Sequence, residues 1–322
     1  MLSLKDIKGQ DNAVKFLENC LASGRTPNAF LFSGPEGVGR AMAARAFIAG
    51  LFSSGKDMAG AEAVSGRVSS GSHPDVMWVK PEKNKYISID DARKAKEFLS
   101  LKPYEAPYTV AVLEDAHMMK AESANALLKV LEEPPFSSLI ILISSRKDLI
   151  LPTVASRCFE LRFTRLPLDI TQKILVKAAG LTDGAARFLA SFSQGSAGDA
   201  LSMIKEGLLE RRRTVIQLLK RAMSMPDAAC LSWDGEAKDV LIEDIDISIM
   251  LLRDAVLYLR GITAGVIDRE GAAELVPLLP SREAEKKAYD IVSELSGLRK
   301  MLIGNANAKL VSQAMNTVVH GK

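Results

Sequence analysis

A strand–loop–helix pattern over residues 29–41, A-F-L-F-S-G-P-E-G-V-G-R-A, constrains the fold more than any other segment of this chain. The apolar run before the loop predicts a buried strand, and the run from Arg40 onward predicts a helix. Three glycines lie between them on the G-x-x-x-x-G frame, at Gly34, Gly37 and Gly39. Such a frame lets backbone N–H groups close around an anion at a helix N-terminus. The segment therefore predicts the outline of a phosphate-binding loop.

The two positions after the glycine frame depart from a working phosphate-binding loop. The frame normally continues with lysine and then serine or threonine, whereas this chain has Arg40 and Ala41. Alanine has no hydroxyl to hold magnesium, and a forked guanidinium is a poor substitute for a compact ammonium between phosphates. We therefore expect a nucleotide-binding fold that has lost the residues that hold the nucleotide.

Strand and helix patterns alternate along the first half of the chain. Apolar runs predict further strands at residues 76–79, 110–113 and 139–143, and residues 159–163 resemble one more strand. Amphipathic spacing predicts helices between the strands, whereas the small, polar, glycine- and serine-rich segment 53–72 predicts a surface loop. Alternation of this kind predicts a parallel α/β sheet. Beyond about residue 163 only helical patterns follow.

An acidic pair, Glu114 and Asp115, directly follows the fully apolar strand predicted at 110–113. Parallel sheets of this class bind ligands at the carboxyl ends of their strands. In a working ATPase such carboxylates coordinate magnesium and activate water. Because the order is Glu-Asp and the loop lacks its lysine and hydroxyl, we interpret the pair as a structural remnant that caps a strand end.

Composition excludes several classes of protein. The 42 basic and 39 acidic residues leave a net charge of +3, which is too small to indicate nucleic-acid binding. Cys20, Cys158 and Cys230 lie far apart and cannot form a disulfide framework or a four-cysteine metal site. The first ten residues have no apolar signal core, and no apolar run approaches the length of a membrane span. We therefore expect a cytoplasmic protein with no membrane partner.

Several motifs occur in a fixed order along the chain. They are G-Q at 9–10, the glycine loop at 34–39, E-D-A-H at 114–117, N-A-L-L-K-V-L-E-E-P-P at 125–135 and S-R-C at 156–158. Together they resemble the AAA+ subunits of bacterial clamp loaders, and the last two motifs are specific to that group. The resemblance implies an AAA+ α/β domain with a P-loop-type parallel sheet over residues 1–164. It also implies a small helical lid domain over 165–205 and an all-α collar, used for oligomerisation, over 206–322.

Within that group, this chain lacks the parts that the working motor subunits keep. The motors carry G-K-[ST] in the loop, an arginine in a turn of the small domain, and usually four zinc-binding cysteines after the loop helix. The corresponding residues here are Arg40-Ala41, then Gly198, then Ala59, Glu62 and Ser65. Missing motor parts beside an intact S-R-C resemble the delta-prime class of DNA polymerase III clamp-loader subunits. We therefore expect no zinc or other metal, no cofactor of its own and no ATPase activity of the isolated chain.

The resemblance implies a role for the S-R-C residues Ser156, Arg157 and Cys158. Arg157 would be an arginine finger that reaches the γ-phosphate of ATP, bound with magnesium on a neighbouring motor subunit. A fixed guanidinium can neutralise the charge that develops on a transferred phosphoryl group, an effect of ~10³–10⁵ in rate. The alternative for Arg157, taken alone, is a solvated surface charge.

The resemblance also implies partners. They are gamma or tau motor subunits, a delta subunit and, through the assembly, a sliding clamp that is loaded onto primer–template DNA during replication by the DNA polymerase holoenzyme. Two rival functions stay open: an active motor ATPase in which Arg40 stands in for the lysine, and an AAA+ adaptor unrelated to replication. The basic run Arg211–Arg213 is interpreted as a solvated helix face, with DNA contact as the less favoured reading.

Overall fold

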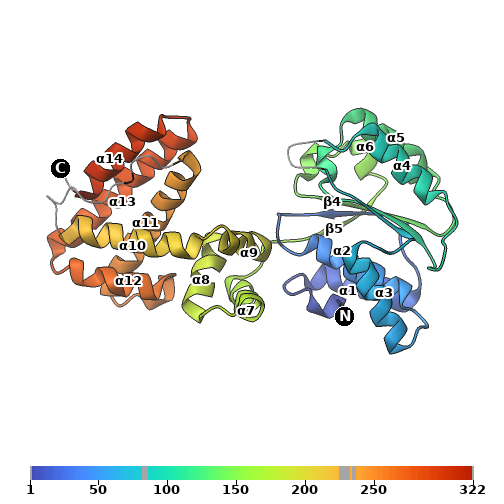
Figure 1. Cartoon of the computed structure of the whole chain (residues 1–322), viewed down its shortest axis with the longest axis horizontal. Coiled ribbons are helices and arrows are strands. Elements are labelled where there is room, and N and C mark those ends of the chain that lie inside the picture. The colour runs from blue at the N-terminus through green and yellow to red at the C-terminus, as the bar shows by residue number, and fades with distance from the viewer. Residues whose placement is uncertain (1, 82–85, 225–232, 234–236, 321–322) are drawn as a thin grey trace. The chain divides into compact units, whose positions relative to one another are not determined.

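The computed structural model describes residues 2–81, 86–224, 233 and 237–320, drawn in colour in Figure 1. Cys230 lies outside them. The chain forms two compact units. The first, here called the α/β unit, contains Met1–Ile170 and Gln194–Asp199, and the second, the helical unit, contains Thr171–Ser193 and Ala200–Lys322. The segment 165–205, predicted as a separate lid domain, is shared between these two units, and the division into three domains stays a prediction.

The α/β unit is built on a five-stranded sheet. Its strands are β1 (Ala29–Ser33), β2 (Val76–Val79), β3 (Thr109–Leu113), β4 (Ser138–Ser144) and β5 (Phe159–Arg162). Their order is β2-β3-β4-β1-β5, and each of these neighbouring pairs is parallel. β1 therefore lies between β4 and β5, with Phe30 opposite Ile141 on one side and Phe159 on the other. The predicted parallel α/β sheet is confirmed.

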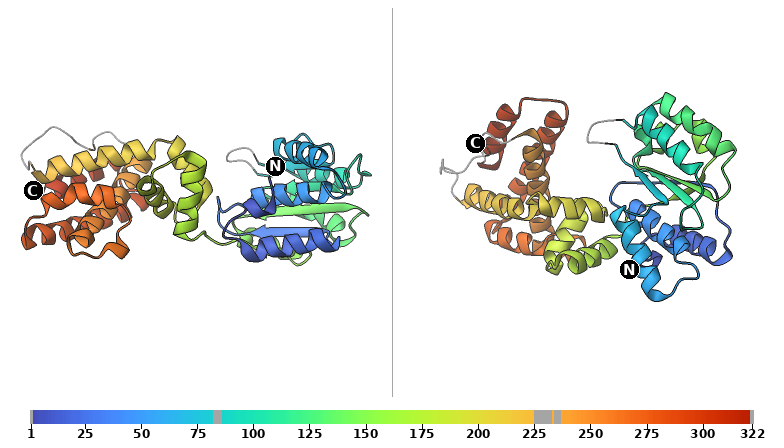
Figure 2. Two further views of the ribbon diagram at one scale, coloured as in Figure 1. Left: turned by 90° about the horizontal axis from the view of Figure 1, so that it is seen from below. Right: turned by 45° about the vertical axis from the view of Figure 1, so that its right-hand side comes forward.

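Two layers of helices cover the sheet (Figures 1 and 2). One layer is α1 (Asp11–Ser23), α2 (Arg40–Phe52) and α3 (Met58–Ser70), and the other is α4 (Ile89–Leu99), α5 (Ala121–Glu132) and α6 (Pro152–Ala155). Successive strand residues point to opposite faces, so Phe30 and Phe32 belong to the core under the first layer and Leu31 to the core under the second. All five residues of β1 are buried, as a strand covered on both faces requires.

Helix α3 corrects the surface loop predicted over residues 53–72. Five of its thirteen residues are glycine or serine, but local contacts favour the helix. The side chain of Asp57 caps the N-terminus by accepting a backbone hydrogen bond from the first turn. Val64 and Val68, four residues apart on one face, are both buried against the core of the α/β unit. The burial of this short apolar stripe outweighs the weak helix propensity of the glycines and serines.

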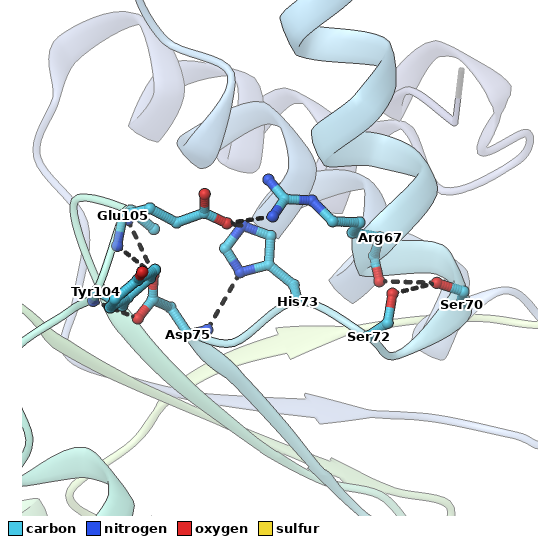
Figure 3. Close-up of polar contacts among 8 residues, drawn as sticks. Arg67, Ser70, Ser72, His73, Asp75, Tyr104 and Glu105 are labelled. Carbon is cyan, nitrogen blue, oxygen red and sulfur yellow. Dashed lines mark hydrogen bonds and ion pairs between the residues drawn. The ribbon is translucent and has the colours of Figure 1, made fainter.

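A buried carboxylate organises the amino ends of β2 and β3 (Figure 3). Asp75, which directly precedes β2, is only 4% exposed. Its two oxygens accept three backbone hydrogen bonds, from the N–H groups of Tyr104 at 2.6 Å and of Glu105 and Ala106 at 2.9 Å each. Because a buried carboxylate is stable only when its oxygens are satisfied, these bonds tie the segment before β3 to the segment before β2.

His73 joins the same cluster as a neutral side chain (Figure 3). Its Nδ1 accepts the Asp75 N–H at 3.2 Å, and its Nε2 lies 3.3 Å from a carboxylate oxygen of Glu105, which also pairs with Arg67 at 2.5 Å. Burial, together with the positive charge of Arg67, lowers the pKa of His73, although the carboxylates of Glu105 and Asp75 oppose the shift. Together these contacts hold the amino ends of β2 and β3 to each other.

Helices follow the sheet to the end of the described chain. They are α7 (Leu168–Ala179), α8 (Asp183–Phe192), α9 (Ala197–Lys205), α10 (Leu208–Ser224), α11 (Lys238–Leu259), α12 (Arg269–Leu275), α13 (Arg282–Ile303) and α14 (Ala308–His320). In the helical unit one hydrophobic cluster reaches from Leu175 to Val319 and encloses Trp233. The predicted all-helical region is confirmed. None of the described helices is both long and apolar enough to cross a membrane.

The basic run on α10 is not the solvated face predicted for it. Arg211 makes two hydrogen bonds of 2.6 Å to Asp244, and Arg212 bonds to both oxygens of Asp268 at 2.5 and 2.6 Å. Both aspartates are fully buried, whereas Arg213 is exposed as predicted. Burial disfavours the charge on Arg212, but its hydrogen bond to Asp268 and the charge of that aspartate outweigh burial and raise the pKa of Arg212.

Candidate functional site

The glycine loop between β1 and α2 has the backbone that the sequence predicts. Gly34, Gly37 and Gly39 have φ angles of 141°, 65° and 101°, a region that side chains disfavour. At Gly34 a Cβ atom would also lie 2.1 Å from the carbonyl oxygen of Phe163. The loop therefore keeps its special conformation, and it is packed closely by its own unit.

Residues 196–199 close over this loop within the α/β unit. The N–H of Gly198 donates to the carbonyl oxygen of Gly37 at 2.9 Å, and the hydroxyl of Ser196 donates to the carbonyl oxygen of Glu36 at 3.1 Å. A Cβ on Gly198 would lie 2.7 Å from the Cα of Gly37, and a Cβ on Gly37 would lie 2.1 Å from the Ser196 hydroxyl. Both positions must be glycine for this contact. Gly198 occupies the position at which the resemblance places an arginine in motor subunits. Because glycine has no side chain, its backbone contacts the backbone of Gly37 directly.

Arg40, the first residue of α2, is buried and only 7% exposed. Burial lowers the pKa of its guanidinium, and the negative charges of Asp115, Glu36 and Glu114 oppose that shift. Within the described residues, the buried Nη1 atom of Arg40 has no hydrogen-bond partner. The side chain is thus an internal cation held near three carboxylates, a different role from that of a lysine that projects into a phosphate site.

The acidic pair does not point to a shared metal position. Glu114 accepts a hydrogen bond of 2.9 Å from the indole of Trp78 and pairs with Lys80 at 3.0 Å, so its carboxylate is engaged by the edge strand β2 and the residue after it. Asp115 adopts the left-handed region at φ 52°, and its carbonyl accepts the N–H of Met118 at 2.7 Å. These contacts support the interpretation of the pair as a remnant that ends β3.

The residues around the loop do not match the donor set of a magnesium–nucleotide complex. Ala41 has no side-chain oxygen for the metal, and the Glu114 carboxylate is already paired. Glu36, inside the loop, accepts a hydrogen bond of 3.0 Å from the Ser145 hydroxyl at the end of β4. The buried Nη1 atom of Arg40 could donate a hydrogen bond to an anion. The rival function, an active motor ATPase, is therefore tested below.

Arg157 lies at the opposite end of the sheet from the glycine loop. It precedes β5 by two residues, and Phe159 at the start of β5 pairs with Phe30 in β1. The loop begins at Gly34, four residues further along β1, which at the rise of a strand is about 13 Å away along the sheet. The two predicted sites are therefore not brought together within one chain.

The S-R-C residues occupy the turn between α6 and β5. The Ser156 hydroxyl donates to the carbonyl oxygen of Thr153 at 3.2 Å, and the Arg157 side chain is 36% exposed. Burial raises the pKa of the Cys158 thiol to about 12, so this thiol is protonated and unreactive at neutral pH. Of the three, only the arginine has the exposure and charge to act on another molecule.

Ala59, Glu62 and Ser65, which correspond by resemblance to zinc-binding cysteines of motor subunits, lie on α3. Ser65 is buried there and accepts the backbone N–H of Leu2 at 3.2 Å, while Ala59 and Glu62 lie in the first turns of the same helix. Among the residues that the structure describes, no group of three or more His, Cys, Asp or Glu side chains could hold a metal ion. The expected absence of zinc from the purified protein stays a prediction.

The sequence did not indicate three partners of the predicted site residues. Trp78 and Lys80 hold Glu114, and Glu132 pairs with Arg157 at 2.6 Å. Glu132 lies inside the N-A-L-L-K-V-L-E-E-P-P motif, so the motif itself was the available signal. Nothing in the spacing of Trp78 and Glu114, which are 36 residues apart, indicated their contact.

Comparison with known proteins places these features in a family. The family model described as DNA polymerase III, delta subunit, matches residues 9–167. The chain is 31% identical over 226 residues to the DNA polymerase III subunit delta' of Pseudomonas aeruginosa, covering 67% of this chain and 68% of that protein. The delta' subunit of Bacillus subtilis is 29% identical over 213 residues, covering 65% of this chain and 64% of that protein.

The chain also resembles tau and gamma/tau subunits of DNA polymerase III over part of their length. It is 28% identical over 212 residues to the DNA polymerase III subunit tau of Bacillus subtilis, which covers 63% of this chain. The chain spans only 37% of the length of that tau subunit, and 31% of the gamma/tau subunit of Mycobacterium tuberculosis. The match to the delta' relatives thus covers a larger share of the relative than the match to the tau relatives does.

Proposed function

This chain belongs to the family of DNA polymerase III delta' subunits, and on that basis we propose that it is a non-hydrolysing AAA+ subunit of a clamp loader. In this proposal it has no ATPase of its own. It completes the active site of a neighbouring motor subunit by supplying Arg157 in trans. The partners are gamma or tau motor subunits and a delta subunit, and the assembly loads a sliding clamp onto primer–template DNA.

The observation that carries the proposal is the separation of Arg157 from the glycine loop of its own chain. The loop lies at the carboxyl end of β1, whereas Arg157 lies two residues before Phe159, which is itself about 13 Å from the start of the loop along the sheet. The loop also lacks the donors for magnesium and is sealed by residues 196–199. An exposed arginine that cannot serve its own loop is suited to a phosphoryl group on another subunit.

The chemistry of such a site lies mainly on the neighbour. ATP and magnesium are held by the motor subunit, and the planar guanidinium of Arg157 forms charge-assisted, bidentate bonds to phosphate oxygens as their charge develops. Ser156 and Cys158 do not take part in bond making. They hold the turn, Ser156 by its bond to Thr153 and Cys158 as a half-buried, protonated thiol.

We expect the isolated chain to show no ATP turnover above background. Its loop offers no hydroxyl at Ala41, and Gly198 brings backbone rather than a cationic side chain to the loop. The measurement is phosphate release at saturating ATP and magnesium, with nucleotide affinity measured in parallel by calorimetry. Turnover that disappears in Glu114→Gln would support the rival motor ATPase, in which Arg40 replaces the lysine.

We propose that the helical unit supplies the main assembly surface. Exposed apolar residues lie at the end of α11 and just after it: Tyr258 is 40% exposed, Leu259 42% and, three residues beyond the helix, Ile262 49%. Tyr289 of α13 is 48% exposed, and the Arg260 guanidinium, which follows Leu259 in the chain, lies 5.8 Å from its ring. Contiguous exposed apolar side chains of this kind mark surfaces that bind partners.

The double variant Leu259→Lys, Ile262→Lys is expected to weaken assembly with the motor and delta subunits by about 30-fold or more, the effect of losing a hot spot of about 2 kcal/mol. The measurement is titration of full-length chain into its partners, followed by size-exclusion chromatography. Met58→Lys is the matched control, because Met58 is 83% exposed on α3 of the α/β unit. Equal assembly of the double variant and this control would exclude the surface.

A further inference from the structure

The Arg157 side chain is held by its own chain in this structure. Its Nη2 atom pairs with Oε1 of Glu132 at 2.6 Å, and its Nη1 atom donates to the carbonyl oxygen of Thr153 at 2.9 Å. A longer contact of 3.4 Å joins Nη1 to the Ser156 hydroxyl. Thr153 lies in the four-residue helix α6, so the guanidinium is a second donor to a carbonyl that also accepts the Ser156 hydroxyl at 3.2 Å.

Glu132 reaches Arg157 because of where α5 ends. The helix stops at Glu132, and Glu133 is followed by Pro134 and Pro135, whose rings disfavour a continued helix. α5 precedes β4 and returns the chain to the amino end of the sheet, which is also where Arg157 precedes β5. The L-E-E-P-P sequence therefore delivers a carboxylate to the arginine at a fixed point.

We infer that Glu132 is a latch that holds Arg157 folded back on its own subunit until a phosphate on the neighbour displaces it. This inference rests on the proposed function of Arg157 as a finger in trans. The Glu132 carboxylate neutralises the guanidinium that the phosphate must recruit, so each engagement of the finger first breaks this pair. Glu132 is thus a positioning residue: it touches no substrate and acts through Arg157.

The latch is weak enough to open. The side chains of Arg157 and Glu132 are 36% and 48% exposed, and ion pairs with such access to solvent favour the paired state by only about 1.4- to 5-fold. Charge-assisted bidentate bonds to a phosphate are stronger than a single-point contact with a carboxylate. The pair therefore lowers the efficiency of the neighbouring site without blocking it.

The test is steady-state ATP hydrolysis by a reconstituted clamp loader that contains Glu132→Gln in this chain. Glutamine keeps the size and an oxygen acceptor but removes the charge. We expect kcat/KM for ATP to rise by about 1.4- to 5-fold. A merely structural role for Glu132 would give a fall or no change, and either result would overturn the latch.

Two further variants separate this inference from the proposed function. In an Arg157→Ala background, Glu132→Gln is expected to give no rise, because the latch has nothing to hold. Glu133→Gln, which removes the same charge one residue further on, is the matched control and is expected to leave kcat/KM unchanged; an equal rise would show a general charge effect and overturn the latch. If Arg157→Ala alone leaves the rate unaltered, the finger itself is wrong. If Arg157→Ala lowers the rate and Glu132→Gln does not raise it, only the latch is wrong.

Discussion

Replacing Asp268 by asparagine is expected to destabilise the helical unit by about 3–5 kcal/mol, because it leaves a buried guanidinium without its counter-charge. Asp268 is fully buried, and both of its oxygens bond to Arg212, which is 8% exposed and lies 5.4 Å from the ring of Phe188. Asparagine keeps the other function of Asp268, which is to cap α12 through the N–H of Gly271 at 2.9 Å. The substitution therefore spares the cap, while it removes the negative charge and replaces one of the two oxygens that Arg212 bonds by an amide nitrogen.

The two tryptophans of the chain allow the measurement to be made on the full-length protein. Trp233 is buried in the core of the helical unit and Trp78 lies in β2 of the α/β unit, so a Trp78→Phe background reports on the helical unit alone. In urea, Asp268→Asn is expected to lower the Trp233 midpoint by about 1–3 M. A variant in which Arg212→Met accompanies Asp268→Leu should recover most of the loss, because no unpaired charge remains.

The control for this prediction is an exposed ion pair between the same two helices, α10 and α12. Lys220 of α10 pairs with Glu274 of α12 at 3.1 Å, and the two side chains are 43% and 52% exposed. Glu274→Gln is expected to change stability by less than about 1 kcal/mol, as solvent-exposed ion pairs do. If Asp268→Asn and Glu274→Gln lowered the urea midpoint by the same amount, the buried pair of Arg212 and Asp268 would not stabilise the helical unit as proposed.

The sheet could be predicted from the sequence because its three central strands, β1, β3 and β4, are mainly apolar runs. β1, β3 and β4 are buried throughout, and their sequences show it without knowledge of any partner. α3 could not be predicted in the same way, since its glycines and serines resemble a loop and only Val64 and Val68, with the Asp57 cap, mark a helix. Tertiary burial decided that segment, and burial is not visible in a local window.

The parts of the candidate site that are formed by residues close together in the sequence could be predicted. The glycine frame, the acidic pair and S-R-C are contiguous in sequence, and each lies where a strand or helix ends. What the sequence did not reveal are pairings over long separations, such as Arg212 with Asp268 across 56 residues or Trp78 with Glu114 across 36. A run of arginines has the same sequence whether its side chains contact water or buried aspartates. The prediction of a solvated face on α10 was therefore wrong for Arg211 and Arg212.

Arg157→Ala is expected to remove the contribution of one finger while leaving the chain folded and the assembly intact. Substitution of an exposed side chain usually changes stability by about 0.5 kcal/mol or less. Loss of an arginine finger lowers hydrolysis at the site it serves by ~10³–10⁵. Other sites in the assembly do not depend on this residue, so the total rate falls only in part. Lysine at this position should restore little, because a point charge lacks the planar fork.

A matched control lies on the adjoining strand. Arg162 in β5 is 76% exposed and pairs with Glu160 at 3.3 Å, so Arg162→Ala removes another glutamate-paired arginine, from the other end of the strand. It is expected to leave hydrolysis unchanged. Equal effects of the two alanine variants would indicate a general loss of positive charge, which is not the mechanism proposed here.

The most direct measurement is ATP hydrolysis by a reconstituted loader in which only the motor subunit next to this chain keeps a working phosphate loop. In that assembly nearly all turnover comes from the site that Arg157 is proposed to complete. We expect Arg157→Ala to lower this rate by ~10³-fold or more, and Arg162→Ala to leave it at the parental value. A parental rate with Arg157→Ala in an intact assembly would contradict the account.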